Sequence, residues 1–291
     1  MRTLPPDIAG FYTKPAHMTD PRELDAVLEG APSDIPGLVA FIQNLLIHPF
    51  WAAAYHQQLS PARQDEVHTR SVHDMLARMQ THDPRPLGFV RTLAQRAVGN
   101  CRHFSTFGTA LFRRAGIPAR ARCGFGMYFE AGKGVDHWLI EYWNGTAWQF
   151  LDAQIDAMQR ALLRLPFDPL NVPREQFLTG GNAWAQHRAG QIDAKKFGIL
   201  DMWGDWFIAG NLIRDVASLN NMEMLPWDSW GTMTGPGESI SPEKVELYDR
   251  LATLAADPDR HFAELRAIYD DSRIHVPHQI FNAMRQRTET V

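Results

Sequence analysis

Cys101 is the residue of this sequence best placed to act as a nucleophile. It follows Asn100, which suits the N-cap of a helix because its side chain can accept a backbone N–H of the first turn. Phe104, Phe107 and Leu111 then recur at helical spacing, which indicates a helix with one side facing a core. A thiol in the first turn of a helix lies beside unpaired N–H groups and the positive end of the helix dipole. The sequence therefore predicts that Cys101 ionises readily to a thiolate.

The end of the same helix is also marked. Gly116 fits the left-handed C′ position, Ile117 fits the hydrophobic contact that follows it, and Pro118 prevents the helix from continuing. We therefore expect a helix from Cys101 to Ala115.

Two strand-like runs follow, residues 135–143 and 146–152, and only Asn144-Gly145 separates them. Asn-Gly between two such runs is a strong signal of a two-residue type I′ hairpin turn. This turn predicts a register in which the numbers of opposed residues sum to 289, so that His137 faces Asp152. Directly opposed residues have Cβ atoms about 4.5–5.5 Å apart. We therefore expect the imidazole and the carboxylate to form a hydrogen bond, unless a bulge shifts the register.

A thiol, an imidazole and a carboxylate in this arrangement are the components of thiol nucleophilic catalysis. His137 would take the proton of Cys101 and later donate it to the leaving group, while Asp152 would fix the tautomer of the imidazole. A cysteine paired with a histidine can ionise at a pKa of roughly 3–4 in place of about 8.5. The backbone N–H of Cys101 is the natural first donor of an oxyanion hole, where the loss of one donor costs about 3–4 kcal/mol.

At these residues the sequence resembles the transglutaminase-like superfamily. The resemblance covers roughly residues 88–156, and its motifs occur in the family's order. They are Gly99-Asn100-Cys101 at the start of the helix, Leu-Phe-Arg-Arg-Ala-Gly-Ile-Pro-Ala-Arg over residues 111–120, His137-Trp138 in a strand and Leu151-Asp152 at the end of the next strand.

The resemblance implies an α+β fold of the papain-like kind, in which the helix carrying Cys101 packs on an antiparallel sheet carrying His137 and Asp152. It also implies an acyl-enzyme thioester that passes to water, as in a peptidase, amidase or deglycosylase, or to an amine, as in crosslinking or amide synthesis. No metal or organic cofactor is required. Members of the family usually draw a second oxyanion donor from a side chain upstream of the cysteine, for which Gln95 and Trp51 are the candidates in this sequence.

The chain is predicted to divide into an N-terminal helical segment (residues 1–85), a catalytic core (residues 86–156) and a mostly helical C-terminal extension (residues 157–291). The extension can belong to the same domain as the core, because the composition does not break sharply. In the strand predicted at 118–128, Arg120 and Arg122 are expected to face solvent, as is Asp136 at the edge of the hairpin. The predicted helices are 22–29, 37–47, 61–79, 86–98, 101–115, 157–165, 201–220, 242–255 and 258–270, with a short one from 277.

Composition limits the classes of function. The 291 residues are enough for one large domain or two small ones. A net charge of −4 argues against a general nucleic-acid or anionic-membrane binder. The start of the sequence shows no apolar signal region, and no apolar run approaches the 18 or so residues of a membrane span. Two cysteines give no disulfide framework, which fits a reducing cytoplasm.

Several alternatives stand beside the catalytic interpretation. His103 with Cys101, Cys123 and His137 could suggest zinc, but structural zinc sites use closely paired ligands, so we expect no metal. A papain-like cysteine peptidase and a non-catalytic binding scaffold with the same fold are the rival functions. We predict cysteine-dependent acyl transfer through a thioester on a small-molecule or peptide acyl substrate. The sequence does not choose between water and an amine as acceptor, and it does not indicate the oligomeric state.

Overall fold

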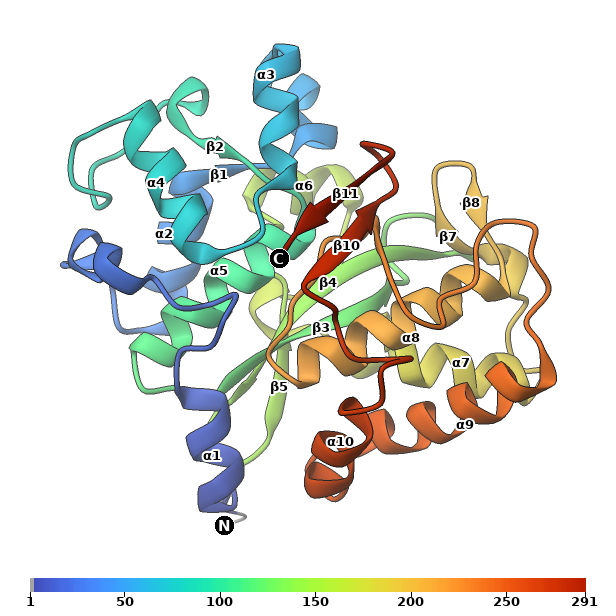
Figure 1. Cartoon of the computed structure of the whole chain (residues 1–291). Coiled ribbons are helices and arrows are strands. Elements are labelled where there is room, and N and C mark those ends of the chain that lie inside the picture. Colours follow the sequence, from blue (N-terminus) through green and yellow to red (C-terminus); the bar gives the residue numbers. More distant parts are fainter. Residues whose placement is uncertain (1–2) are drawn as a thin grey trace. The chain divides into compact units, whose positions relative to one another are not determined.

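The computed structural model describes residues 3–291, which divide into two compact units (Figure 1). The first unit comprises the chain up to Ala121 together with Leu139–Val172. The second unit comprises Arg122–Trp138 and Pro173–Val291. Strands β3 (Ala119–Gly126) and β4 (Gly134–Trp143) contribute residues to both units.

The first unit is built around helix α5 (Cys101–Arg114), which contacts α1, α2 and α4 (Figure 1). The apolar side of α5 carries Phe104, Phe107 and Leu111, and these side chains share a buried core with Ile42 and Ile140. The other elements of this unit are α1 (Pro6–Thr13), η1 (Arg22–Leu28), α2 (Ile35–Leu45), β1 (Leu46–Ile47), η2 (Pro49–Tyr55), α3 (Pro61–Gln64), η3 (Asp65–His68), α4 (Val72–His82), η4 (Leu93–Gln95), β2 (Ala97–Val98), β5 (Trp148–Leu151), α6 (Ala157–Leu163) and η5 (Pro169–Asn171).

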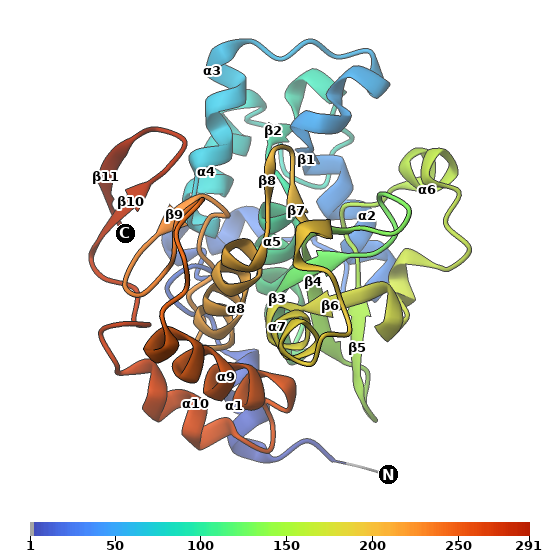
Figure 2. The same cartoon turned by 90° about the vertical axis from the view of Figure 1, so that its right-hand side faces the viewer.

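The second unit has a helical layer in which α7, α8 and α9 pack against one another and α10 packs on α8 and α9 (Figure 2). Its elements are η6 (Arg174–Gln176), β6 (Phe177–Thr179), α7 (Gly180–Arg188), η7 (Ala194–Lys196), β7 (Phe197–Ile199), β8 (Met202–Trp203), α8 (Asp205–Leu219), β9 (Asp228–Ser229), α9 (Pro242–Ala256), α10 (Phe262–Tyr269), β10 (Gln279–Asn282) and β11 (Arg287–Thr290).

The largest sheet has the strand order β6-β3-β4-β7-β8, and β5 pairs with β4. The β3–β6, β4–β5 and β7–β8 pairs are antiparallel, whereas β4 and β7 run parallel, so the sheet is mixed. Two small sheets are separate from it: the parallel β1–β2 pair and the antiparallel set β11-β10-β9. Helices with mixed sheets confirm the predicted α+β class.

The helix that carries Cys101 begins and ends where its local signals predict. Asn100 is the N-cap, and its side chain accepts the N–H of Arg102. At the other end Gly116 has φ of +78°, which a residue without Cβ adopts at little cost. The N–H of Gly116 donates to the carbonyl of Arg113, and the N–H of Ile117 donates to that of Phe112. These two bonds form a Schellman motif, which satisfies carbonyls that the helix leaves unpaired.

Several of the other predicted helices differ from the structure. The helix expected over 61–79 is broken, because the side chain of Ser71 accepts the N–H of Asp74 and starts α4 as a new helix. The helix expected from 258 begins later, at Phe262. The short helix expected from 277 is wrong, since β10 and β11 form an antiparallel pair there. Alternate residues of β10 are buried, which is the period-two pattern of a half-buried strand.

The expectation that Arg120 and Arg122 face solvent is wrong. Both side chains are buried. In the first unit, Nε of Arg120 donates to Oε2 of Glu141 at 2.8 Å, and its guanidinium lies 3.9 Å from the ring centroid of Trp148. In the second unit, Arg122 makes two hydrogen bonds to Asp215, at 2.9 and 2.8 Å. A buried arginine requires such partners, and they come from distant parts of the chain.

Candidate active site

Cys101 is the first residue of α5 and is only 7% exposed. The turn around it is held by a reciprocal cap. The side chain of Asn100 accepts the N–H of Arg102 at 3.1 Å, and the N–H of Asn100 donates to Nδ1 of His103 at 3.2 Å. Nε2 of His103 lies 2.9 Å from the carbonyl oxygen of Thr69. Hydrogen bonds from the side chains of Asn100 and His103 therefore hold the backbone on both sides of Cys101.

His103 has a structural role in this turn. Burial, with a smaller contribution from the charge of Arg102, lowers its pKa well below the usual value, so the ring is neutral. Because a carbonyl oxygen can only accept, Nε2 carries a proton and donates it to Thr69. Within residues 3–291, no group of three or more His, Cys, Asp or Glu side chains is arranged to hold a metal ion.

The predicted hairpin register is wrong. Trp143 pairs with Trp148 and Ile140 with Leu151, so the numbers of opposed residues sum to 291, not 289. The loop has four residues, 144–147, and Asp152 lies one residue beyond β5. His137 and Asp152 are therefore not directly opposed in the strand ladder.

The side chain of Asn144 explains the longer loop. A type I′ turn needs positive φ at both central residues, but of this pair only Gly145, with φ of +96°, has it. Oδ1 of Asn144 instead accepts the backbone N–H groups of Thr146 and Ala147, at 3.0 and 2.9 Å. This side-chain turn replaces the tight backbone turn that the sequence predicts.

His137 lies on β4 in the second unit and is 2% exposed. The ring of Phe129 meets it edge-on with centroids 4.7 Å apart, and Tyr128 lies at 6.0 Å. The expectation that the neighbouring Asp136 faces solvent is wrong, because its side chain is buried. Oδ1 of Asp136 accepts a hydrogen bond of 2.8 Å from Nδ2 of Asn211, which lies on α8. Burial raises the pKa of Asp136. The strand is thus anchored to α8 through the residue next to His137.

Asp152 lies in the first unit and is 1% exposed. Its N–H donates to the carbonyl of Pro169 at 2.8 Å, and its Oδ1 accepts the N–H of Gln154 at 3.0 Å. Gln43, on α2, donates from Nε2 to the carbonyls of Ala153 and Ile155, both at 3.2 Å. The backbone that follows the carboxylate is therefore held in one conformation by side chains.

The three predicted catalytic residues are distributed over both units. Cys101 and Asp152 belong to the first unit, at the start of α5 and just after β5. His137 belongs to the second unit, on β4. All three side chains are almost completely buried, and each lies at a point where the backbone is fixed by specific contacts. Their joint action remains a prediction.

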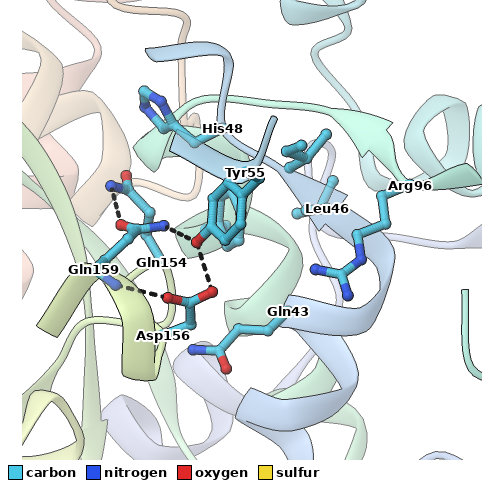
Figure 3. A pocket seen from close by; sticks show the side chains of 10 residues that line it. Gln43, Leu46, His48, Tyr55, Arg96, Gln154, Asp156 and Gln159 are labelled. Atoms are coloured by element: carbon cyan, nitrogen blue, oxygen red, sulfur yellow. Dashed lines mark hydrogen bonds between the residues drawn. The ribbon is translucent and has the colours of Figure 1, made fainter. Parts of the chain in front are cut away.

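A small polar pocket opens in the first unit beside this segment, with a cavity volume of about 10 Å³, which is room for about one water molecule (Figure 3). Ile47 and Phe104 are among its apolar lining residues. The carbonyl of Ile47 accepts the N–H of Gly99, two residues before Cys101, and Phe104 follows Cys101 by three. The pocket is therefore adjacent to the start of α5. Its polar lining includes Gln43, Tyr55, Arg96, Gln154, Asp156 and Gln159.

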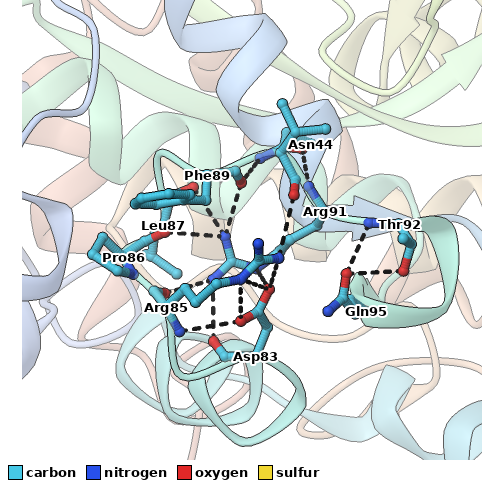
Figure 4. A network of polar contacts seen from close by, with 10 residues as sticks. Asn44, Asp83, Arg85, Pro86, Leu87, Phe89, Arg91, Thr92 and Gln95 are labelled. Atoms are coloured by element: carbon cyan, nitrogen blue, oxygen red, sulfur yellow. Dashed lines mark hydrogen bonds and ion pairs between the residues drawn. The ribbon is translucent and has the colours of Figure 1, made fainter.

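The segment that leads to Cys101 is not the helix expected over 86–98. The guanidinium of Arg91 is buried and donates to backbone carbonyls at 83, 85, 87 and 89, at 3.0–3.3 Å (Figure 4). Asp83 in turn pairs with Arg85 at 2.6 Å. Because a side chain occupies these carbonyls, the segment folds as a loop, and only η4 and β2 follow before Cys101.

The two candidates for a second oxyanion donor lie in short helices. Oε1 of Gln95 accepts the N–H and the hydroxyl of Thr92, at 3.0 and 2.9 Å, and so caps η4 (Figure 4). Trp51 is half-buried in η2, the helix that also carries Tyr55 into the pocket. The structure thus gives Gln95 a capping role and leaves both candidates as predictions.

The residues of the polar pocket were missed by sequence reasoning. One local signal exists: Asp156 is the N-cap of α6, and its Oδ1 accepts the N–H of Gln159, as an Asp-x-x-Gln pattern predicts. The contact that turns this cap into a pocket wall is long-range, because Tyr55 reaches Asp156 across 101 residues of sequence. No pattern in the chain predicts that contact.

Comparison with known proteins identifies the core. Residues 54–153 match the model of the transglutaminase-like superfamily, a class of generally cysteine-dependent enzymes. The resemblance found in the sequence is thereby confirmed, and the chain carries a transglutaminase-like core with the corresponding α+β fold. No helix among the described residues is both long and apolar enough to cross a membrane.

A solved structure is similar to part of the chain. A chain from Cytophaga hutchinsonii, named provisionally as a cysteine protease, aligns with a TM-score of 0.35 and 18% identity. The alignment covers 60% of the present chain and 46% of the other, so the chain spans less than half the length of that structure. A comparison with curated proteins gives no match.

Proposed function

We propose that this protein catalyses acyl transfer through a thioester on Cys101, using an amide or acyl substrate. The observation that supports this most is the superfamily match, which spans residues 54–153 and therefore includes Cys101, His137 and Asp152. The position of Cys101 in the first turn of a capped helix adds to it, because such a position favours the thiolate.

In the proposed reaction, His137 holds the proton of Cys101 and the thiolate attacks the carbonyl carbon of the substrate. The resulting tetrahedral intermediate collapses to a thioester, and the leaving amine takes its proton from His137. Water or an amine then attacks the thioester and returns a proton to His137, which frees the thiol. Asp152 orients the imidazole and stabilises its charged form. Every step uses side chains of the chain itself and needs no redox partner.

The experiment is to trap the acyl-enzyme. The purified protein is incubated with a metabolite and peptide pool from a lysate, and its intact mass is measured before and after neutral hydroxylamine, which cleaves thioesters. We expect added mass on the wild type that hydroxylamine removes. Cys101→Ala should acquire none, and Cys123→Ala, which replaces a fully buried cysteine in β3, serves as the matched control. Labile mass that persists on Cys101→Ala, or none on the wild type, would contradict the proposal.

A further inference from the structure

Strand β2, which leads into Cys101, is paired with β1 along one side. In this parallel ladder Ile47 lies opposite Val98 but bonds to the residues on either side of it, and the N–H of Gly99 donates to the carbonyl of Ile47 at 3.1 Å. The N–H of Val98 and the carbonyl of Arg96 therefore point away from β1, as the backbone groups of an edge strand do. Such groups need partners on that side when they are buried.

Two side chains take the place of a second neighbouring strand. Oε2 of Glu66, on η3, accepts the N–H of Val98 at 2.7 Å. Arg63, on α3, donates from Nη1 to the carbonyl of Ala94 at 2.7 Å and from Nη2 to the carbonyl of Arg96. Arg63 and Glu66 thus satisfy the carbonyl and the N–H that β2 directs away from β1.

The carboxylate of Glu66 is itself held from two sides. The residue is only 2% exposed, and its Oε1 lies 2.7 Å from Nε of Arg63 and 2.8 Å from Nε2 of His82, the last residue of α4. A buried carboxylate is tolerated when it is paired and its oxygens accept hydrogen bonds. The arginine and the carboxylate therefore act on the strand as one unit, and we call Arg63 and Glu66 the strand clamp.

The segment that carries the strand clamp also contacts the turn after Cys101. The N–H of Thr69 donates to the carbonyl of Glu66 at 3.0 Å, which ties Thr69 to the clamp. The carbonyl of Thr69 in turn accepts Nε2 of His103 at 2.9 Å. This segment therefore holds the chain before the nucleophile and the chain after it.

We propose that Arg63 and Glu66 are positioning residues for the nucleophile, because they fix β2 and through it the place of the sulfur and the backbone N–H of Cys101. The inference rests on the proposed function, in which both groups act on the substrate carbonyl. Two residues separate β2 from Cys101, and one of them, Gly99, is packed so closely that a Cβ there would lie 2.7 Å from Cβ of His103. A displacement of β2 is therefore passed on to the thiol, and about 1 Å of misplacement can slow a reaction about a hundredfold.

The test measures the alkylation of Cys101 by iodoacetamide as a function of pH in variants of the strand clamp. Glu66→Gln keeps the shape of the side chain but has a single acceptor, so its amide nitrogen must face either the N–H of Val98 or the guanidinium of Arg63. Arg63→Met removes the donors to both carbonyls. We expect each variant to raise the midpoint of the pH–rate profile by about one pH unit and to slow alkylation at pH 7 about tenfold.

The direction of the two effects separates position from charge. Glu66→Gln removes a negative charge and Arg63→Met removes a positive one, so an effect of charge alone on the thiolate would move the two midpoints in opposite directions. An effect of position raises both. Arg63→Lys keeps the charge but lacks the planar fork, so it should also raise the midpoint, and it replaces Arg63→Met if that variant does not fold.

Two further measurements show whether the effect is local. The ratio of the hydrogen-exchange rate of the Val98 amide to that of Phe107, in the middle of α5, should rise about tenfold in Glu66→Gln. Glu141→Gln is the matched control, because Glu141 is also 2% exposed and pairs with Arg120 in the first unit at 2.8 Å. This control should leave both the midpoint and the exchange ratio unchanged.

Four results would overturn the inference: midpoints that move in opposite directions, midpoints that do not change, an exchange ratio that does not rise, or the same rise of the midpoint in Glu141→Gln. Alkylation does not require a thioester, so the outcome is independent of acyl-enzyme trapping. Raised midpoints without trapping on the wild type would refute the proposed function alone. Trapping with unchanged midpoints would refute the role of the strand clamp alone.

Discussion

The close packing of α5 against Ile140 of β4 can be tested by adding one methyl group at Gly108. An ideal Cβ at this position would lie 2.3 Å from Cδ1 of Ile140 and 3.1 Å from Cδ1 of Ile42. Replacing a glycine by alanine inside a helix normally stabilises it by about 1 kcal/mol. An extra methyl group in a well-packed core costs about 1–3 kcal/mol. Since Ile140 is completely buried, we expect the clash to exceed the gain and Gly108→Ala to lose about 1 kcal/mol.

A double-mutant cycle with Ile140→Val identifies the clash as the cause. This substitution removes the atom that the new methyl group would meet, and alone it costs about 0.5–1.5 kcal/mol. In its background, Gly108→Ala should be neutral or stabilising, which gives a coupling energy of about 1 kcal/mol or more. The free energy of unfolding is measured by urea denaturation. If Gly108→Ala stabilises the wild type, or the two changes add within about 0.5 kcal/mol, the close packing argued for this helix is wrong.

Three further predictions concern buried polar groups. Arg122→Met should cost about 3–5 kcal/mol in urea denaturation, because it leaves Asp215 buried without its cation, and adding Asp215→Leu should recover most of the loss. Because burial lowers the pKa of His103, the unfolded chain binds an extra proton as pH falls below about 6.5, so wild-type stability should fall by up to about 1.4 kcal/mol per pH unit. His103→Gln, which keeps an acceptor for the cap, should lack this part of the fall, and an identical pH profile would contradict the assignment. Asn100→Ala should cost about 1 kcal/mol and Asn100→Asp much less, and equal losses would exclude the cap.

The parts of the fold that could be predicted are those that depend on hydrogen bonds between residues close together in the sequence. Helix α5 was found with its boundaries, because Asn100 and Gly116 make their bonds within a few residues of themselves. Serine before proline likewise predicts the start of α9, where the side chain of Ser241 accepts the N–H of Lys244. Such caps involve neighbours in the sequence and do not depend on the rest of the fold.

The parts that could not be predicted depend on side chains that compete with the backbone or reach across the chain. The side chain of Asn144 accepts two backbone N–H groups of its own loop, and each residue of β4 consequently pairs two residues further along the chain than predicted. Two of the carbonyls that a helix at 86–98 would use, those of Leu87 and Phe89, accept hydrogen bonds from Arg91 instead. Arg122 finds its carboxylate 93 residues away, so its burial in β3 has no signature in the strand itself. For the candidate site, residue types and order indicated the chemistry, while the pocket beside Asp152 required the structure.

The central claim is that Cys101 is an activated nucleophile assisted by His137. The most direct measurement is the rate of alkylation of Cys101 by iodoacetamide between about pH 5 and pH 9, followed by peptide mass spectrometry with Cys123 as internal reference. We expect a rate for Cys101 that is nearly independent of pH from about 5 upward, and that becomes dependent on pH in His137→Ala. A rate that is slow at neutral pH and rises around 8.5, as for an ordinary thiol, in both proteins would contradict the claim.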